Sequence, residues 1–507
     1  MTQDEPLLPV ANRLESFWLT ERDPELQKVR TTAIIPETAD VVVIGSGLTG
    51  AMAAWRIYKG LGQEVSVVML EADEVCGSAT ARNGGHCKPL AFLGYREQAE
   101  KHGDAISNEL LTFEAAALEQ YVAIVLEEDI DCDLHVTRAF DVWMSEDGVD
   151  AGKADWAARQ AAFPESMKTA DIRTVNDLQA LQDLTGIKGA RWGAHYPAGH
   201  LWPYKLATAL IKRCIAKGMN LQTYTPATSL ESSGDRWLVG TSRGSITAQS
   251  VIIATNAYTS SILPEFKPLI IPVRGTACSI TPAASHSAGS LPGPLQYSYG
   301  LRFGTGEVDY MIPRQGRGRV PGRGDQSYIL GGAKGCFLSD PALWYDNKRD
   351  DEEMPGARAY FEGYIGNHFI GWNGGEKGNV DHVWSGILGY SSDLLPYVGE
   401  VPDRPGVFIC AGFTGHGMPR IPGCTAAIST LVVSRLAAGQ VTPEAQKSFE
   451  AILPKPYWIT RERLQSKVNL IKVAMGQGTK ALEGITSGSV ESADEVALLA
   501  RGVQAGL

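Results

Sequence analysis

The chain has 507 residues, of which 57 are acidic and 46 basic, and the net charge of −11 argues against a nucleic-acid partner, whose phosphates attract basic surfaces. Its composition, with 44% hydrophobic and 20% charged side chains, excludes a disordered chain, and its length gives room for two or three domains. Glycine is enriched, with 55 residues or about 11% against a usual value of about 7%. We therefore expect many tight turns and close approaches of the backbone to a ligand.

The sequence indicates neither membrane insertion nor secretion. No apolar run approaches the roughly 18 residues that a bilayer span requires, and residues 1–39 lack the apolar core of a signal peptide. The eight cysteines are scattered without a Cys-x-x-Cys pair, which argues against a zinc site and against a disulfide framework. We expect a reduced, cytoplasmic protein without a metal or a membrane partner, and the sequence does not indicate an oligomeric state.

The first regular unit predicted along the chain is a β-turn-α-β unit. Residues 1–38, which precede it, are polar and punctuated by proline, so we expect an extended arm on the surface. Residues 40–44 form a continuous, β-branched run that is typical of a strand buried on both faces of a parallel sheet. A helix is expected over 51–58 and a second strand over 64–70.

A Gly-x-Gly-x-x-Gly motif, formed by Gly45, Gly47 and Gly50, joins this strand to this helix. In a dinucleotide-binding fold these glycines permit the tight turn, the approach of a pyrophosphate and close helix packing, and the helix N-terminus faces the anion. Glu71 ends the second strand, where an acid accepts hydrogen bonds from a ribose, so FAD or NAD is favoured over NADP. The remaining residues predicted to contact the cofactor here are Ser46, Leu48 and Thr49.

Helical and strand patterns alternate through the rest of the chain. The predicted helices are 105–128, 151–186, 203–217 and an amphipathic 425–438. The predicted strands are 221–230, 237–240, 245–254, 383–389 and 407–411. Residues 283–326 are rich in Gly, Pro, Ser and Arg, so loops and hairpins are expected there, and the chain beyond 442 is expected to be helical with a loosely held end.

A second glycine-containing segment separates FAD from NAD. Residues 71–86 resemble the second signature of the flavin-dependent D-amino-acid-oxidase-like superfamily, which includes glycine oxidase, sarcosine oxidase and γ-glutamylputrescine oxidase. The Arg-Asn-Gly-Gly core is most similar to the γ-glutamylputrescine oxidase branch and related fungal flavoproteins. The resemblance implies that FAD is held here, with Arg82 facing its pyrophosphate or flavin, by Ala72, Ser78, Ala79, Thr80, Arg82, Asn83, Gly84, Gly85 and His86.

Later stretches extend the resemblance to about residues 38–435. Residues 251–258, with Thr255 and Asn256, are similar to the strand that returns to the cofactor, and Ala227 or Thr228 would meet the adenine through the backbone. Residues 384–399 and 411–418 resemble the C-terminal flavin signature. Because a helix follows, its N–H groups are expected to stabilise negative charge on the flavin N1/O2 edge. The cofactor residues implied here are Gly412, Phe413, Thr414, Gly415, His416, Gly417 and Met418.

The candidate catalytic residues lie in or beside these signatures. His86 would line the pocket, although a packing role is also open, and Lys88 would assist oxygen reduction unless it is a surface lysine whose stem lies on apolar side chains. His416 would contact the flavin. Amino-acid oxidases of this superfamily hold the substrate carboxylate with an arginine, but the matching position here is about Leu388, beside Ile387. Either Tyr310 or Arg314, in a stretch that resembles the strand of pocket residues in the family, substitutes for it, or the substrate is a larger or secondary amine rather than an α-amino acid.

The pocket and the attachment of the flavin are also predicted from this resemblance. The stretch that carries the flavin-linking cysteine in sarcosine-oxidase relatives has none here, which favours non-covalent FAD, with Cys410 or Cys424 as a covalent alternative. An aromatic pocket would be formed by Trp202, Tyr204, Trp384 and Tyr390 unless these are core residues.

Two further motifs are set aside. Residues 240–244 match Gly-x-Ser-x-Gly, but they lie between two predicted strands, whereas a hydrolase elbow needs a strand followed by a helix. The Arg/Gly cluster at 314–323 is expected to be a solvated hairpin tip rather than an anion site.

The sequence predicts an α/β fold, with a Rossmann-like FAD-binding domain and an antiparallel-sheet substrate domain. The former comprises 38–100, 195–262 and 375–440, the latter 101–194 and 263–374, with an N-terminal arm at 1–37 and a helical extension at 441–507. The predicted function is an FAD-dependent oxidase of a small amine or amino-acid-like molecule, with hydride transfer to flavin N5 and reoxidation by O2. The alternatives are an NAD(P)H-dependent flavin monooxygenase, for which no second glycine motif is found, and an inactive flavin-binding scaffold.

Overall fold

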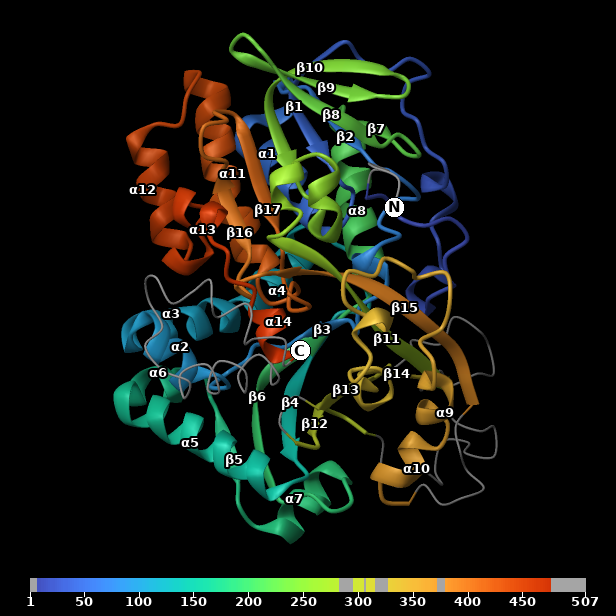
Figure 1. The fold of residues 1–507 in the computed structure, drawn as a ribbon, viewed down its shortest axis with the longest axis vertical. Coiled ribbons are helices and arrows are strands. Elements are labelled where there is room, and N and C mark those ends of the chain that lie inside the picture. The colour runs from blue at the N-terminus through green and yellow to red at the C-terminus, as the bar shows by residue number, and fades with distance from the viewer. Residues whose placement is uncertain (1–6, 282–294, 305–306, 315–326, 372–378, 476–507) are drawn as a thin grey trace.

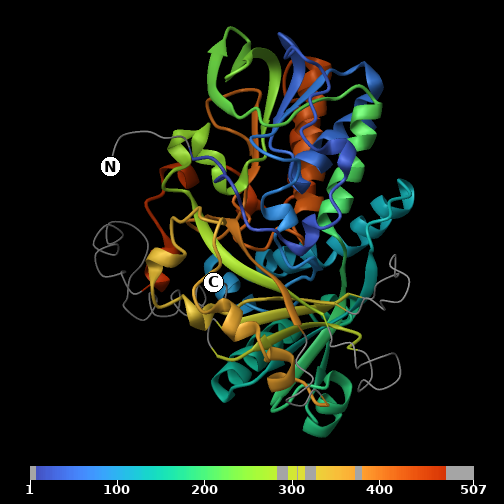
Figure 2. The ribbon, with the colours of Figure 1, turned by 90° about the vertical axis from the view of Figure 1, so that its right-hand side faces the viewer.

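The computed structural model describes residues 7–281, 295–304, 307–314, 327–371 and 379–475. They form two separate β-sheets, one in each half of the molecule along its long axis (Figures 1 and 2). The chain passes between the sheets four times, so each sheet is assembled from separated segments. The predicted α/β fold with an antiparallel second domain is therefore confirmed.

The upper sheet in Figure 1 is the dinucleotide-binding sheet, with strand order β16-β17-β10-β1-β2-β7. Its parallel centre pairs β10 with β1 and β1 with β2, and these strands are buried on both faces as their apolar runs predict. Its strands are β1 Thr38–Ile44, β2 Val67–Leu70, β7 Asn220–Gln222, β8 Ala227–Ser233, β9 Arg236–Thr241, β10 Gly244–Ile253, β16 Tyr397–Glu400 and β17 Val407–Ala411. The predicted strand 221–230 is in fact two strands, because residues 223–226 leave the sheet between β7 and β8.

Three helices cover one face of this sheet. Helix α1 (Leu48–Leu61) contacts both α8 (Pro203–Ala216) and α11 (Ile421–Ala438), and Figure 2 shows α8 and α11 running along the same side. Helix α11 is long and apolar enough by composition to cross a bilayer, but it packs against α1, α4, β16 and β17 as a core helix. Within 425–438 the less buried residues Ala426, Thr430, Val433, Ser434 and Ala437 share one face of α11, as the predicted amphipathic helix requires.

The lower sheet carries the second domain, with order β15-β11-β14-β13-β12-β4-β6-β3 and β5 beside β6. All its pairings are antiparallel except that of β12 with β4. Its strands are β3 His86–Cys87, β4 His135–Trp143, β5 Arg173–Val175, β6 Trp192–His200, β11 Ile270–Thr281, β12 Ser298–Arg302, β13 Val308–Pro313, β14 Tyr328–Gly331 and β15 Asn379–Ser391. Because β6 and β15 belong to this sheet, we propose that the domain boundaries lie after these strands rather than at 195 and 375.

Short helices surround the two sheets. They are α2 Tyr95–His102, α3 Asp104–Ala115, α4 Ala117–Glu127, α5 Glu146–Ala162, α6 Pro164–Thr169, α7 Leu178–Thr185, α9 Ala357–Phe361, α10 Tyr364–His368, α12 Pro443–Ile452, α13 Arg461–Gln465 and α14 Leu470–Ala474. The predicted helix 105–128 breaks at Ala116, and the predicted helix 151–186 is interrupted by Pro164 and by β5, which joins the edge of the sheet. Residues 240–244 form the tight turn between β9 and β10, as expected.

The N-terminal arm is not an extended surface segment. Trp18, Leu19 and Leu26 are buried in the core cluster that includes α1 and α8, and Trp18 packs edge-on against Trp202. We call residues 7–26 the N-terminal strap. The expectations for residues 282–294, 315–326 and 476–507 lie outside the described residues.

Replacing Trp18 by alanine is expected to lower the free energy of unfolding by about 3–5 kcal/mol, because it empties a fully buried indole site. Urea unfolding followed by circular dichroism measures the change. Leu126→Ala removes a side chain that is 75% exposed and is expected to stay within about 0.5 kcal/mol of wild type. Equal effects of the two substitutions would contradict the structural role of the strap.

Candidate active site

One cavity of about 1260 Å³ brings together the separated segments that the sequence singles out. One end is lined by the glycine turn after β1, by parts of 71–84 and by 226–227. The other end is lined by residues of β3, β12, β13 and β15 and by parts of 93–100 and 332–344. Residues 254–258 and 413–421 border the cavity between them. The cavity is large enough for an elongated cofactor together with a small substrate.

The glycine turn has the geometry that its sequence predicts. Gly45 has φ +106°, and a Cβ there would lie 2.6 Å from the Ala254 carbonyl oxygen, whereas a Cβ on Gly50 would lie 2.0 Å from the Gly45 carbonyl oxygen. The N–H groups of Gly47 and Thr49, which line the cavity at the start of α1, meet no acceptor among the described residues. Such unpaired N–H groups at a helix N-terminus suit a pyrophosphate.

Glu71 supports this turn from the next strand. Its carboxylate accepts hydrogen bonds from the Ser46 N–H at 3.0 Å, the Ser46 hydroxyl at 2.6 Å and the Asp73 N–H at 3.0 Å. Glu71 also lines the cavity, where the predicted contact with a ribose would occur. That contact stays a prediction.

The segment after Glu71 is fastened by a buried arginine. The guanidinium of Arg82 donates to the carbonyls of Gly77 at 3.0 Å, Ser385 at 3.0 Å and Leu14 at 2.8 Å, and it lies 3.4 Å from the Asp350 carboxylate. Burial lowers the pKa of Arg82 to about 10, although Asp350 opposes the shift. Because all three guanidinium nitrogens are engaged by protein groups, we assign Arg82 a positioning role in place of the predicted contact with the pyrophosphate or flavin.

The N-terminal strap fastens the same segment from the other side. The Arg13 guanidinium donates to the Gly77 carbonyl at 3.0 Å and to the Ser78 hydroxyl at 3.1 Å, and it forms an ion pair with Asp73. The Trp18 indole N–H donates to the Asn83 carbonyl. Leu8 and Pro9 of the strap line the cavity itself. The sequence analysis missed this role. The aromatic residues Phe17 and Trp18 in an otherwise polar arm could have indicated that the arm is partly buried.

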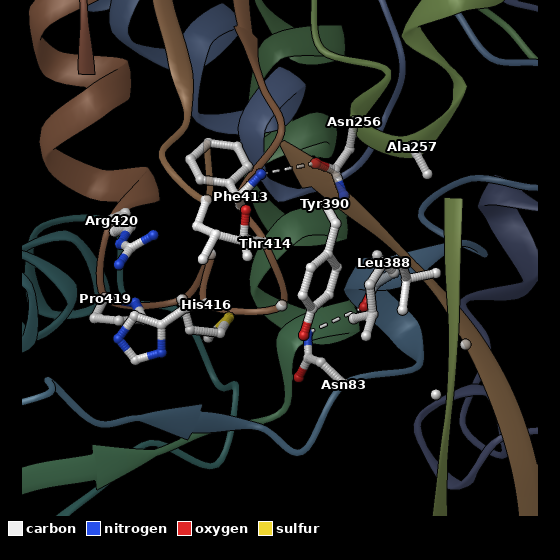
Figure 3. Close-up of a pocket in the computed structure, with 18 of the residues that line it drawn as sticks. Asn83, Asn256, Ala257, Leu388, Tyr390, Phe413, Thr414, His416, Pro419 and Arg420 are labelled. Carbon is white, nitrogen blue, oxygen red and sulfur yellow. Dashed lines mark hydrogen bonds between the residues drawn. The ribbon is translucent and has the colours of Figure 1, made fainter. Parts of the chain in front are cut away.

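The loop of the C-terminal signature uses some of its N–H groups internally. The Asn256 carboxamide oxygen accepts from the N–H of Gly412 at 3.0 Å and of Phe413 at 3.2 Å (Figure 3), and Thr414 donates to the Gly389 carbonyl at 2.8 Å. The N–H groups of Gly415, Gly417 and Met418 meet no acceptor among the described residues, and these three residues line the cavity just before α11. If this loop stabilises negative charge on the flavin, as the sequence predicts, the N–H groups of these three residues are the ones left to do so.

His416 belongs to a charged cluster that only the fold reveals. Its Nε2 lies 3.0 Å from one carboxylate oxygen of Glu114, and Arg420 donates to the other at 2.8 Å; Figure 3 shows His416 and Arg420 beside each other. Burial would raise the pKa of Glu114, but the charges of His416 and Arg420 outweigh it and lower that pKa to about 2. Glu114 lies on α3, about 300 residues from its partners, so no local pattern indicates it.

At the other end of the cavity, His86 and Tyr310 lie against each other. Their rings meet edge-on with centroids 5.3 Å apart, the Ser298 hydroxyl lies 3.1 Å from His86 Nδ1, and the buried His86 Nε2 has no partner among the described residues. Burial, and to a smaller extent Lys88, lower the pKa of His86 to about 3. A Cβ on Gly84 would lie 2.2 Å from the Tyr310 ring, so this glycine is required for packing.

Lys88 is not a surface lysine. Lys88 lines the cavity, its ammonium group lies 2.8 Å from the Asp141 carboxylate, and only 12% of the side chain is exposed. Arg302, which sequence analysis missed, donates to the same carboxylate at 3.0 Å and also lines the cavity. Lys88 and Arg302 therefore share one buried carboxylate at the wall of the cavity.

Several predicted site residues lie elsewhere. Arg314 does not line the cavity, because its guanidinium lies over the rings of Trp18 and Trp202, at 5.4 and 5.2 Å, and pairs with Asp133. Of the four predicted pocket aromatics only Tyr390 lines the cavity, whereas Trp202, Tyr204 and Trp384 are core residues. The predicted cofactor residues that do not line it are Ser46, Gly50, Gly85, Thr228 and Gly412.

Three of these five residues lie in surroundings that explain why they do not line the cavity. Ser46 bonds Glu71 and Cys76, and Thr228 is exposed. A Cβ on Gly85 would lie 2.8 Å from the Trp18 ring and from the Leu201 carbonyl oxygen, so Gly85 serves packing. The glycine excess thus reports close packing around the cavity as well as contact with a ligand.

The cysteines support non-covalent binding of the cofactor. Cys410 and Cys424 are fully buried against each other and do not line the cavity. Cys76 lines it, but its thiol donates to the Ser46 carbonyl at 2.9 Å, and burial raises its pKa well above the usual value. With unpaired N–H groups before both α1 and α11 on one cavity, the residues present fit FAD.

Comparisons with known proteins give one matching family and several relatives. The profile of the family described as "FAD dependent oxidoreductase" matches residues 40–431. The chain is 24% identical over 386 residues to "Probable oxidoreductase OrdL" of Rhizobium meliloti (strain 1021), covering 75% of this chain and 79% of that protein. It is 22% identical over 433 residues to glycine oxidase of Bacillus licheniformis, covering 81% and 96%.

Solved structures share the fold. Glycine oxidase from Geobacillus kaustophilus superposes with a TM-score of 0.62 at 19% identity, covering 84% of this chain and 99% of that one. L-amino acid deaminase from Proteus vulgaris, without its specific insertion sequence, gives a TM-score of 0.61 at 18% identity, covering 87% and 99%.

Arg13→Ala is expected to weaken FAD binding at least about 10-fold, because it removes the hydrogen bonds that hold Gly77 and Ser78 beside the cavity. Fluorescence titration of the apoprotein with FAD measures the dissociation constant. Lys28→Ala changes an exposed residue just beyond the strap and is expected to bind FAD as wild type does. An unchanged affinity in Arg13→Ala would show that the strap does not position the cofactor segment.

Glu114 is expected to make stability depend on acid pH. Its pKa of about 2 in the folded protein lies below the usual 4.5, so up to about 3 kcal/mol of stability is present above pH 5 and is lost as the pH falls towards 2. Glu114→Gln removes this contribution, so its loss of stability relative to wild type should shrink as the pH is lowered. Urea unfolding of both proteins at pH 7, 5 and 3 tests this, and a constant difference would contradict it.

Proposed function

The chain belongs to the FAD-dependent oxidoreductase family, and from this premise we propose that it oxidises a C–N bond of a small amine or amino-acid-like substrate. The observation that carries the proposal is the single cavity that joins the glycine turn to the pocket formed by His86, Lys88 and Tyr310. The names of relatives, which include glycine oxidases and an L-amino acid deaminase, support the same type of reaction.

When bound, FAD supplies the acceptor for a hydride at its N5 atom and is reoxidised by O2. The residues of the chain bind and orient around this chemistry. The N–H groups of Gly415, Gly417 and Met418, together with the N-terminus of α11, stabilise negative charge at their end of the cavity. Asn256 holds their loop in place through Gly412 and Phe413.

At the reactive end, His86 orients the substrate without titrating near neutral pH. Because its pKa is about 3, the ring stays neutral, and Nε2 is left to hydrogen-bond the substrate. The Tyr310 ring and Leu388 form apolar walls beside it, and His416 Nε2 lies 3.0 Å from the Glu114 carboxylate. Substrate therefore binds as an unprotonated amine without a dedicated catalytic base.

Lys88 is the proposed cation for the reaction with O2, since it lies at this end and is held by Asp141. The reaction is proposed to occur in the cytoplasm, which the eight unpaired cysteines support.

Anaerobic mixing with candidate amines tests the function. We expect flavin absorbance near 450 nm to bleach with an amine alone and to return when O2 is admitted, with one H2O2 formed per amine oxidised. Bleaching that requires NADPH would instead indicate a monooxygenase. Failure of every amine, amino acid and nicotinamide donor to bleach the flavin would indicate a non-catalytic scaffold.

A further inference from the structure

We propose that the cavity holds an apolar subsite that receives a hydrocarbon or aromatic group of the substrate, and that residues 441–475, the C-terminal segment, fix one wall of it. This inference rests on the proposed function and specifies its substrate class as an amine with an apolar substituent. The C-terminal segment lies beyond residues 40–431, the range that the family profile matches, so the family pattern does not account for this wall.

The first argument is a group of six apolar side chains that pack on one core cluster and also line the cavity. Three of them are buried members of that cluster, and the other three are partly exposed and pack against it. Apolar surface that faces a cavity is stabilised when an apolar group covers it. We call these residues the apolar subsite, and they are Val273, Phe337, Leu338, Trp344, Leu388 and Leu394.

The second argument is the register of β11 and β15, which places the apolar subsite beside the predicted cofactor residues. Val273 lies directly opposite Leu388, and directly opposite residues share one face of an antiparallel sheet. Tyr390, two residues after Leu388, lies on the same face, and a Cβ on Gly415 would lie 3.2 Å from its hydroxyl oxygen. The apolar subsite therefore adjoins the loop of the C-terminal signature, and Figure 3 shows Leu388 beside Tyr390.

The third argument is that the charged side chains near this wall interact with other groups. Arg274 also lines the cavity, but it lies on the opposite face of the β11–β15 pair, where it donates to the Ser385 hydroxyl at 3.2 Å. Burial lowers the pKa of Lys334, three residues before Phe337, to about 8, and the charge of Asp309 opposes this shift. The apolar subsite itself contributes no ionisable group, so it favours an uncharged group over an ion.

The fourth argument is a strained residue in the wall of the apolar subsite. Leu394 has φ +67°, a left-handed conformation that disfavours a side chain as large as leucine. Such a conformation persists only where the surrounding structure holds it, and it is concentrated at functional sites. Because Leu394 lines the cavity, whatever holds its backbone also sets the position of this wall.

The C-terminal segment holds this backbone through Arg463. The Arg463 guanidinium donates to the Asp393 carboxylate at 2.8 and 3.1 Å and to the Leu395 carbonyl at 2.9 Å. It therefore binds the residues on both sides of Leu394. Helix α14 of the C-terminal segment packs in the same core cluster as the apolar subsite, so the segment supports this wall at two places.

Calorimetric titration of the FAD-loaded protein with acetamide, butanamide and hexanamide tests the inference without turnover. The three molecules carry neither an amine nor a charge, and they differ only in the length of the hydrocarbon chain. We expect the dissociation constant to fall about 3- to 4-fold for each methylene group added, because each one is transferred from water to the apolar subsite. We call the ratio of the dissociation constants of acetamide and hexanamide the chain-length gain.

Substitutions within the apolar subsite locate the hydrocarbon chain. Leu388→Asn places a polar group on this wall and should lower the chain-length gain at least about 5-fold, while the affinity for acetamide changes by less than about 2-fold. Leu178→Asn changes a side chain that is 54% exposed on α7 and should leave the whole series unchanged. If Leu388→Asn loses FAD or secondary structure, Leu338→Asn is titrated in its place with the same expected loss.

Arg463→Met tests the contribution of the C-terminal segment. It releases the backbone around Leu394 and should lower the chain-length gain at least about 3-fold with little change for acetamide, whereas general damage to the fold would weaken both amides. Arg461→Met removes an arginine that is 64% exposed and pairs with Asp403, and it should bind the series as wild type does. Leu394→Gly removes the side chain and relieves the strained φ, so it should lower the chain-length gain without lowering the free energy of unfolding.

Three results would overturn the inference. Equal affinities for acetamide and hexanamide in the wild-type protein would show that the flavin ring or the protein itself covers these side chains. An unchanged chain-length gain in both Leu388→Asn and Leu338→Asn would place the hydrocarbon chain elsewhere in the cavity, and an unchanged gain in both Arg463→Met and Leu394→Gly would exclude the C-terminal segment from this wall. Because the titration involves no oxidation, it can succeed or fail independently of the anaerobic bleaching that tests the proposed function.

Discussion

The buried ion pair between Arg82 and Asp350 is the interaction on which the rest of the site depends. Both side chains are 1% exposed, and Arg13 of the strap approaches the same carboxylate to 3.9 Å. Leu14 donates its N–H to the Asp350 carbonyl and accepts from Arg82, so the strap, the cofactor segment and the loop before α9 meet at one point. Because Arg82 also binds the Ser385 carbonyl on β15, this network ties the two sheets together beside the cavity.

Such a network is costly unless every member is present. An isolated buried charge is strongly unfavourable, and removing one partner leaves the others unpaired. Burial raises the pKa of Asp350, although Arg82 and Arg13 oppose the shift. Burial also lowers the pKa of Arg82, so both shifts show that burial disfavours the charged forms. The network is therefore a device for positioning residues 77–83, and the strap supplies part of the wall that closes the cavity.

The sequence predicted those features that depend on neighbouring residues. The β-branched run of β1, the glycine turn and Glu71 are local, and the structure has them at the expected positions. The extent of α11 was predicted within about one turn, and its less buried residues lie on one face as the amphipathic prediction requires, whereas its contacts with α1 and α4 could not be predicted locally. The predicted helix 151–186 is interrupted by β5, because pairing with β6 at the edge of the sheet outweighs the helical propensity of these residues.

Residues that act through distant partners could not be identified in the same way. Glu114, Asp141 and Arg302 lie in unremarkable surroundings in the sequence, and each acquires its role only when α3, β4 and β12 are brought to the cavity. Conversely, Arg314 was singled out because residues 310–314 resemble a strand of pocket residues in the superfamily, yet its guanidinium lies over Trp18 and Trp202. Alternation along a strand predicts on which face of the sheet a side chain lies. Whether a long side chain then extends into a cavity or over neighbouring aromatic rings depends on the packing around it.

The two ends of the cavity attract negative charge by different physical means, and this difference has a consequence for specificity. The cofactor end uses backbone N–H groups before α1 and α11, which are fixed by the fold and require no counter-ion. The other end presents the side chains of Lys88 and Arg302, which share the Asp141 carboxylate. Groups that the backbone supplies are fixed by the fold, whereas the charge at the other end can change with one or two side chains.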